Sequence, residues 1–262
     1  MNDRLQTSIS YADRTSIRWR GYDLMTEILG KHDFAETMYL LVTGRLPESW
    51  ERQIFDACLI TLMEHGLTPH AIVTRLVADS NPDQVQVAIA SGLMCVGDVF
   101  AGTMEGCGQL LLEGLDRSDR EAWCRSVAED HKQRRRALPG FGHPLHKPDD
   151  PRSERLFQIA VEAGAKGDAI ALLMQLGGVV DDVYGRHLTI NATGALAALL
   201  LEVGIQPPIM RGVAVTSRAA GLTAHIAEEQ SSGSGRKIWN LVENEFSYTS
   251  GNDDPAKGAS PK

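Results

Sequence analysis

The segment PGFGHP at residues 139–144 combines residue types that could do chemistry. Gly140 and Gly142 allow the backbone to approach a ligand closely and to expose its N–H groups. His143 carries an imidazole that can titrate near neutral pH. Arg152, nine residues further on, can hold a carboxylate through two parallel hydrogen bonds. The segment therefore predicts a binding loop for a carboxylate-bearing ligand, although a plain solvated Gly/Pro loop has the same composition.

Three further charged residues lie in apolar stretches that have helical spacing. Arg218 follows Ser217 in a small-residue helix, where a guanidinium is costly unless it is paired. Its partner is either a protein carboxylate or an anionic ligand. Asp98 and Glu105 are seven residues apart and share one face across two helical turns. These two carboxylates are either polar groups at a helix end or part of a site.

The remaining histidines and basic residues allow weaker predictions. His65, in Glu64-His65-Gly66 at a helix end, and His70 lack the spacing of a helical zinc motif, so we predict no metal site. The basic run at 132–136, which ends in Arg136, directly precedes the PGFGH segment. It could attract a phosphate-bearing ligand, or it could be a solvated helix end that balances its dipole.

The elements that would position these residues are almost all helices. Residues 8–21 predict short extended pieces or a hairpin, and from Asp23 onward the apolar spacing is helical. Residues 82–114 are rich in small apolar residues, which predicts a buried segment. Residues 137–154 interrupt the helices with glycine and proline. No β-α-β alternation occurs, so the predicted class is all-α, with ten or more helices around one or two very apolar central ones.

We expect one domain over residues 1–230, with a smaller helical part around 140–190. A C-terminal segment over 231–262 follows, and we expect its last dozen residues to be disordered. Asp181 and Asp182 are expected at a helix end rather than in catalysis.

Composition excludes several classes of protein. The 262 residues carry 26 Lys+Arg and 34 Asp+Glu, a net charge of −8, which argues against a nucleic-acid binder. No secretory signal and no run of about 18 apolar residues is visible, so no membrane association is expected. The four cysteines fit no zinc pattern and suggest free thiols in a reducing compartment. We therefore expect a cytoplasmic protein.

The order of the motifs resembles that of the citrate synthase superfamily, over about residues 7–230. It is most similar to the short lyase branch, citryl-CoA lyase, which is also the C-terminal module of ATP-citrate lyase. The matching pieces, in order, are Ile17-Arg18-Trp19-Arg20-Gly21-Tyr22, Glu64-His65-Gly66, Gly97-Asp98, Ala101-Gly102, PGFGH at 139–143 with Arg152, Asn191-Ala192, and Ser217-Arg218-Ala219-Ala220-Gly221.

The resemblance implies a short citrate synthase-like multi-helix fold with a small N-terminal extended segment. It implies a homodimer or higher homo-oligomer whose active site lies near the subunit contact. The implied small-molecule partners are an acyl-CoA and a 2-oxo acid such as oxaloacetate. No cofactor would be bound permanently, because coenzyme A enters as part of the substrate or product.

The resemblance also implies roles for particular residues. His65 would bind the oxo acid, and His143 would contact the oxygen on the reacting carbon. Arg152 and Arg218 would hold the carboxylates. The backbone of Pro139, Gly140, Phe141 and Gly142 would contact coenzyme A, with Arg136 of the basic run nearby.

Two departures from the family pattern bear on the activity. Glu105 stands where citrate synthases have a histidine that stabilises the thioester enolate, which favours the lyase branch. Asn191 stands where the family has an aspartate, and an amide cannot act as a general base. The sequence therefore predicts a lyase that cleaves citryl-CoA or a related acyl-CoA. We expect His143, Asn191 and His65 to be catalytic, with His143 as base at the hydroxyl, and Glu105 to bind substrate. The alternatives are a condensing acyltransferase and a catalytically altered CoA-binding protein.

Overall fold

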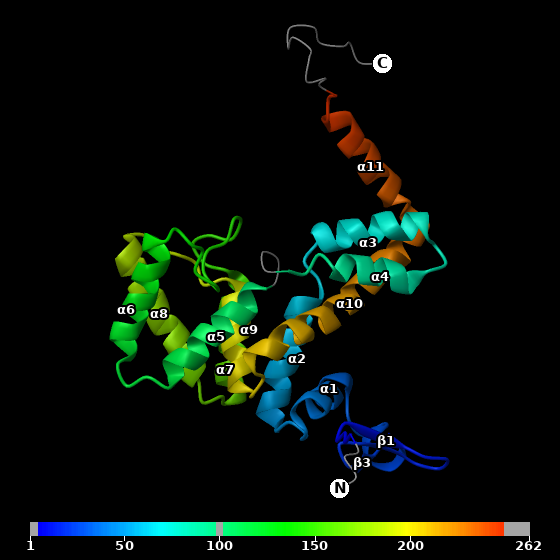
Figure 1. Ribbon diagram of the computed structural model, residues 1–262, viewed down its shortest axis with the longest axis horizontal. Helices are drawn as coiled ribbons and strands as arrows, with labels where there is room; N and C mark the ends of the chain where they lie inside the picture. Colours follow the sequence, from blue (N-terminus) through cyan, green and yellow to red (C-terminus); the bar gives the residue numbers. More distant parts are fainter. Residues whose placement is uncertain (1–4, 98–101, 249–262) are drawn as a thin grey trace. The chain divides into compact units, whose positions relative to one another are not determined.

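The computed structural model describes residues 5–97 and 102–248 (Figure 1). Asp98 and the last dozen residues lie outside these ranges. The chain forms two compact units, which are described separately. Unit 1 contains residues 1–64 and 96–218, and unit 2 contains residues 65–95 and 219–262.

Unit 1 begins with a small antiparallel sheet, as the sequence predicts. Strands β1 (Ser10–Ala12), β2 (Ile17–Trp19) and β3 (Tyr22–Asp23) pair in chain order. The helix expected after Asp23 is only a short π-helical turn, η1 (Leu24–Ile28), which the Asp23 carboxylate caps. Leu24 and Ile28 bury their side chains against Leu40 in a small cluster.

Helices α1 (Phe34–Thr43) and α2 (Ser49–Met63) follow with the expected signals. A capping box at Asp33 starts α1, and Gly44 ends it with a left-handed φ of 89°. Helix α2 buries one apolar side, with Ile54, Cys58 and Leu59 at most 5% exposed, and Met63 in its last turn is 37% exposed.

Five consecutive helices contribute to the large core of unit 1, together with buried residues of α1, α2 and the first part of helix 207–232 (Figure 1). The most apolar is α9, whose residues are buried around almost its whole circumference. It is the central helix that the composition predicts. Together these helices are α5 (Thr103–Leu115), α6 (Arg120–Gln133), α7 (Pro151–Ala163), α8 (Asp168–Tyr184) and α9 (Ala192–Glu202).

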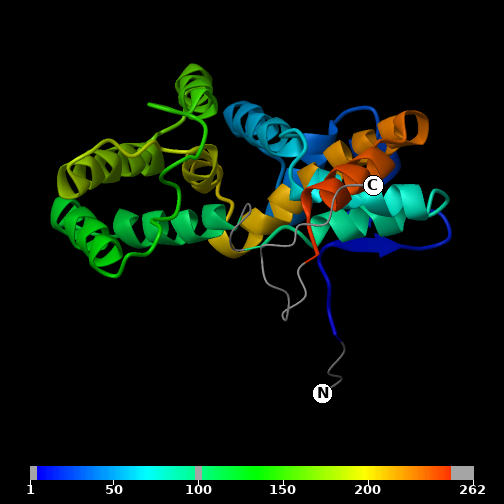
Figure 2. The same cartoon turned by 90° about the horizontal axis from the view of Figure 1, so that it is seen from above.

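Unit 2 contains α3 (Pro69–Ser80), α4 (Val85–Leu93), α11 (Ser234–Glu245) and the part of α10 (Pro207–Ser232) beyond Arg218. Two views show α3 and α4 side by side (Figures 1 and 2). A Cβ on Gly92 of α4 would lie 2.8 Å from the carbonyl oxygen of His70, so glycine permits this close packing.

Two expectations about the helices need correction. The buried segment predicted over 82–114 is divided between α4 and α5, and α4 leaves Met94 at its end 84% exposed. The smaller part expected around 140–190 is not separate, because α7 and α8 pack into the core of unit 1 through residues such as Leu156 and Leu172.

Within the described residues, no single helix is long and apolar enough to cross a membrane. Helices α9 and α10 together have the length and apolar composition of a membrane span, but the chain bends by 115° between them.

Candidate active site

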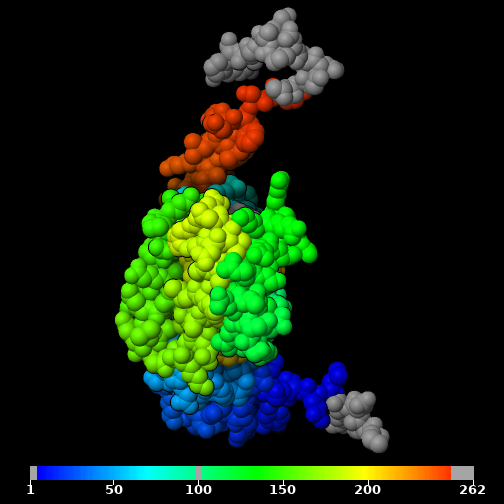
Figure 3. Space-filling view, turned by 90° about the vertical axis from the view of Figure 1, so that its left-hand side faces the viewer, coloured from blue at the N-terminus to red at the C-terminus, as the bar shows by residue number. Residues whose placement is uncertain are grey.

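The PGFGH loop is fixed to the segment that precedes α9. The N–H of Gly142 donates to the carbonyl of Thr189 (2.7 Å), and the N–H of Asn191 donates to the carbonyl of Gly140 (3.0 Å). Phe141 and Ile190 form an antiparallel bridge between the same segments. The space-filling view shows green and yellow surface side by side on the face turned to the viewer (Figure 3). The loop is therefore a fixed part of unit 1.

Glycine is required at position 140. Its φ is 86°, and a Cβ there would lie 2.6 Å from the Sγ of Cys107 and 3.0 Å from the Cα of Gly194. Only a residue without a side chain allows the loop to lie this close to α5 and α9.

His143 is oriented by two backbone amides. Its Nδ1 lies 3.1 Å from the N–H of Leu145 and 2.9 Å from the N–H of His146. An amide N–H can only donate, so Nδ1 accepts and the neutral ring carries its proton on Nε2. That nitrogen lies 3.5 Å from Nη2 of Arg152, another donor. This arrangement suits an anionic oxygen and differs from the sequence-based expectation that His143 is a base.

Arg152 is held by Asp150, which is 1% exposed. The Asp150 carboxylate accepts from Nε (2.9 Å) and Nη2 (2.8 Å) of Arg152, and from the N–H of Ala192 (3.0 Å). Burial alone would raise the pKa of Asp150, but the hydrogen bonds from Arg152 and Ala192 outweigh it and lower that pKa. Asp150 therefore joins the starts of α7 and α9 and orients the guanidinium.

One group of side chains among the described residues could hold a metal by distance alone. Ligand atoms of His143, His146 and Asp150 lie within 4.8 Å of one another. However, the Arg152 guanidinium forms an ion pair with Asp150, and Nδ1 of His143 is occupied. A cation would face that positive charge, so the group is better suited to an anion.

Asn191 has a structural task. Its Oδ1 accepts from the N–H of Gly194 (3.1 Å) and the hydroxyl of Thr193 (2.7 Å), while its Nδ2 donates to the carbonyl of Gly142 (2.8 Å). The side chain thus caps α9 and ties it to the loop. The catalytic role expected for Asn191 stays a prediction.

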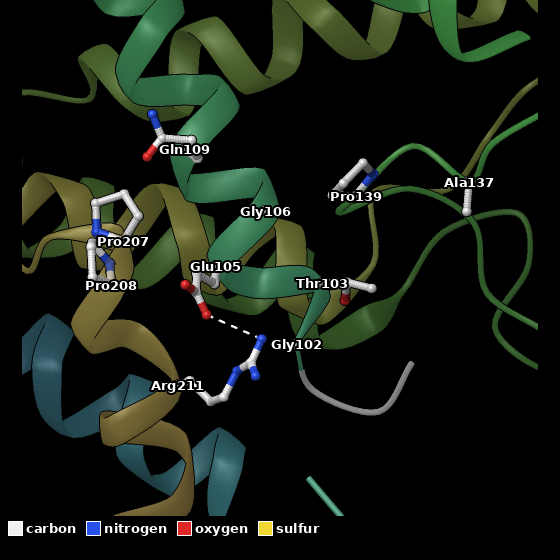
Figure 4. A pocket seen from close by; sticks show the side chains of 10 residues that line it. All are labelled: Gly102, Thr103, Glu105, Gly106, Gln109, Ala137, Pro139, Pro207, Pro208 and Arg211. Atoms are coloured by element: carbon white, nitrogen blue, oxygen red, sulfur yellow. Dashed lines mark ion pairs between the residues drawn. The ribbon is translucent and has the colours of Figure 1, made fainter. Parts of the chain in front are cut away.

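Glu105 lines a cavity of about 490 Å³ between the starts of α5 and α10 (Figure 4). Its carboxylate lies 3.1 Å from Nη2 of Arg211, as the dashed line shows. Pro139 of the loop lines the same cavity. The position that differs from the citrate synthases is therefore paired with a neighbouring arginine.

Of the other predicted residues, two are paired with acids and one belongs to unit 2. Arg218 lies 3.9 Å from Glu64, and burial lowers the pKa of its guanidinium. Arg136 is exposed and binds Asp130 at 2.9 Å, so this part of the basic run is partly neutralised. His65 is exposed and belongs to unit 2. The roles expected for these three residues stay predictions.

Sequence reasoning missed Asp150, Thr103 and Thr193. For Asp150 a local signal existed, because an aspartate directly before a proline is a common helix start, and its carboxylate accepts from the N–H of Arg152 (3.1 Å). For the two threonines no local signal exists, since they are 90 residues apart and meet only in the fold.

His187 forms a pH-dependent link between Asp149, which precedes α7, and Asp181 of α8. Its ring binds Asp181 through Nδ1 (2.6 Å) and Asp149 through Nε2 (3.1 Å), and these hydrogen bonds raise the pKa of His187. Both ring nitrogens can donate to carboxylates only in the charged form. The raised pKa means that this stabilisation is complete below the unfolded pKa of about 6.5 and is lost as the pH rises through the folded value.

We therefore expect His187→Gln to lower the melting temperature at pH 6 and to leave it nearly unchanged at pH 9. The effect should stay below about 1 kcal/mol, because these exposed charges are screened. Thermal unfolding of both proteins at the two pH values tests this, and an equal loss at both would contradict it.

The fold and the site together define a class of protein: an all-α protein with a glycine-rich histidine loop beside an arginine held for an anion. Residues 47–240 match the family model described as citrate synthase, C-terminal domain, and the chain belongs to this family. Citrate/2-methylcitrate synthase from Bacillus subtilis is 27% identical over 201 residues, which are 75% of this chain and 52% of that protein. The chain spans about half the length of the curated relatives it matches.

Two solved structures extend the comparison. Citryl-CoA lyase from Hydrogenobacter thermophilus is 26% identical with a TM-score of 0.81, over 98% of this chain and 96% of that chain. A mutant ATP citrate lyase from Methanosaeta concilii, in complex with (3S)-citryl-CoA, has a TM-score of 0.79. It is 16% identical, over 97% of this chain and 43% of that chain, and so shows the fold alone. The predicted all-α, citrate synthase-like fold is confirmed.

Proposed function

We propose that this chain is a carbon–carbon lyase that cleaves citryl-CoA, or a related 3-hydroxy-3-carboxy acyl-CoA, to an acyl-CoA and a 2-oxo acid. The observation that carries the proposal is the match with citryl-CoA lyase over nearly the whole length of both chains. The curated relatives with synthase names are about twice as long.

In the proposed reaction the substrate hydroxyl gives its proton to a water molecule as the carbon–carbon bond breaks, because Nε2 of His143 already carries a proton. The bonding electron pair passes to the thioester enolate, whose carbon then takes up a proton. The oxygen on the reacting carbon would lie near Nε2 of His143 and Nη2 of Arg152, which are 3.5 Å apart. Two fixed donors stabilise negative charge as it develops on this oxygen.

The other substrate contacts follow the family resemblance. Arg152 and Arg218 would hold carboxylates of the oxo acid, with His65 as a further contact. The loop backbone over 139–142 would contact coenzyme A, which enters and leaves as part of substrate and product. The homodimer implied by the resemblance stays a prediction.

A condensing acyltransferase is the second candidate, because the curated relatives carry citrate synthase names. Such an enzyme would form the carbon–carbon bond that the lyase breaks. Glu105 in place of the synthase histidine weighs against it. A CoA-binding protein without activity is the third, and Asn191 is its support.

The test is to mix the purified full chain with citryl-CoA and to follow oxaloacetate with an NADH-coupled malate dehydrogenase assay. The proposal predicts oxaloacetate release. Acetyl-CoA and oxaloacetate, supplied together, should release free thiol far more slowly. If free thiol is released without oxaloacetate, the result favours the condensing acyltransferase. If neither reaction occurs, the result favours the CoA-binding protein without activity.

We expect His143→Ala to lower kcat about 10²- to 10³-fold, as removal of an oxyanion donor does in other enzymes. The matched control is His131→Ala, since the His131 ring forms a hydrogen bond with the Val127 carbonyl within its own helix, α6. The control should keep wild-type activity. Equal activity of His143→Ala and wild type would contradict the assigned role.

A further inference from the structure

The side-chain amide of Asn191 sets the direction of a chain of hydrogen bonds. Nδ2 must donate to the Gly142 carbonyl, which can only accept, so Oδ1 is the acceptor of the Thr193 hydroxyl proton. The hydroxyls of Thr193 and Thr103 are 2.9 Å apart. Since the proton of Thr193 is used on Asn191, Thr103 must be the donor in this contact.

This chain of hydrogen bonds connects two parts of unit 1 that are far apart in the sequence. It begins at Thr103, the first residue of α5, which lines the cavity beside Glu105 (Figure 4). It ends at the carbonyl of Gly142, the residue before His143. The intermediate residues, Thr193 and Asn191, lie at the start of α9.

We infer that Thr103 is a positioning residue for the PGFGH loop, which acts through Thr193 and Asn191 on the backbone beside His143. The inference rests on the proposed function for its catalytic meaning, but the hydrogen-bond chain stands without it. It also explains the asparagine at position 191. A carboxylate there could accept from Thr193 and Gly194, yet it would place a second acceptor against the Gly142 carbonyl.

The isosteric Thr103→Val variant removes the first donor and leaves the shape of the side chain unchanged. A single hydrogen bond contributes about 0.5–1.5 kcal/mol, or about two- to tenfold in an equilibrium. We expect amide hydrogen exchange at Gly142 and Asn191 to be faster by about this factor, and kcat with citryl-CoA to fall by a similar factor. Thr103→Ser keeps the donor and should restore both.

The control is Thr61→Val in α2, because the hydroxyl of Thr61 donates to the Ala57 carbonyl within its own helix. It should leave exchange in the loop unchanged. A second readout is the imidazole ¹⁵N shift of His143, which reports the tautomer of the folded state. A mere loss of global stability does not move this shift, whereas displacement of the loop changes it.

The inference is overturned if folded Thr103→Val shows wild-type exchange at Gly142 and Asn191 and wild-type ¹⁵N shifts, or if Thr103→Ser behaves like Thr103→Val. If Thr103→Val does not fold, Asn191→Asp decides. It should speed loop exchange by the same reasoning, and wild-type exchange in this variant would refute the inference. Because exchange and ¹⁵N shifts need no turnover, they remain decisive if the chain proves to have no lyase activity.

Discussion

Asp150→Asn is expected to destabilise the protein by about 3 kcal/mol, the lower end of the cost of breaking a buried ion pair. The carboxylate is fully buried, while Arg152 keeps 28% of its side chain exposed and can recover some hydration. The amide would face Nε or Nη2 of Arg152 with a donor instead of an acceptor. Arg152 would then lose its fixed orientation, so kcat/KM with citryl-CoA should fall more than stability alone explains.

The same carboxylate predicts a dependence on acid. The pKa of Asp150 is lowered in the folded protein, so its contribution is complete above the unfolded pKa of about 3.9 and is lost as the pH falls through the folded value. The Asp150→Asn variant lacks this carboxyl group, so its stability does not include the part that the wild type loses in acid. The difference in stability between variant and wild type should shrink as the pH falls below about 4.

Urea unfolding at pH 7 and pH 3 measures both effects. The control is Asp149→Asn, the neighbouring carboxylate, which is 67% exposed and contacts His187. It should cost less than about 1 kcal/mol. If the two variants are equally stable at pH 7, the role assigned to Asp150 is incorrect.

Gly194→Ala is expected to have the second large effect. A Cβ at this position would lie 2.5 Å from the carbonyl oxygen and 3.0 Å from the Cα of Gly140, both backbone atoms. The loop or α9 must therefore shift, and overpacking of this kind costs about 1–3 kcal/mol. Because the displaced backbone belongs to the PGFGH loop, the proposed lyase activity should fall together with stability.

Gly178→Ala is the matched control for a glycine in a helix. It lies in α8, and a Cβ there would meet nothing within 4 Å. Alanine favours a helix over glycine by about 1 kcal/mol, so this variant should be slightly more stable than wild type. Thermal unfolding of both variants tests the pair of expectations. A stabilised Gly194→Ala would show that loop and helix do not pack as closely as described.

Local patterns in the sequence predicted much of the helical framework, because the apolar spacing and the capping residues act within a few positions of one another. The Asp33 cap and the Gly44 end of α1 show how local these signals are, since each lies directly beside the helix that it bounds. The division between α4 and α5 was not predictable in this way, since residues 82–114 have the composition of one buried segment. The π-helical turn at Leu24–Ile28 was also invisible to a pattern based on 3.6 residues per turn.

The site shows the same limit more strongly. The loop at 139–143 and its partner Arg152 could be predicted because they are close in the chain. The orientation of His143 could not, since it follows from the amides of Leu145 and His146 in one particular loop conformation. The linkage of Asn191 to Gly142 depends on residues 49 positions apart, and only the tertiary fold brings them together.

This long separation has a consequence during biosynthesis. The histidine loop gains its hydrogen-bonding partners only when residues 189–191 have been added to the chain. At about 5–20 residues per second, translation of the 49 intervening positions takes about 2–10 seconds. Throughout this interval the loop is synthesised but lacks residues 189–191, so a ribosome that stalls between α7 and α9 carries a histidine loop without its hydrogen bonds to Thr189 and Asn191.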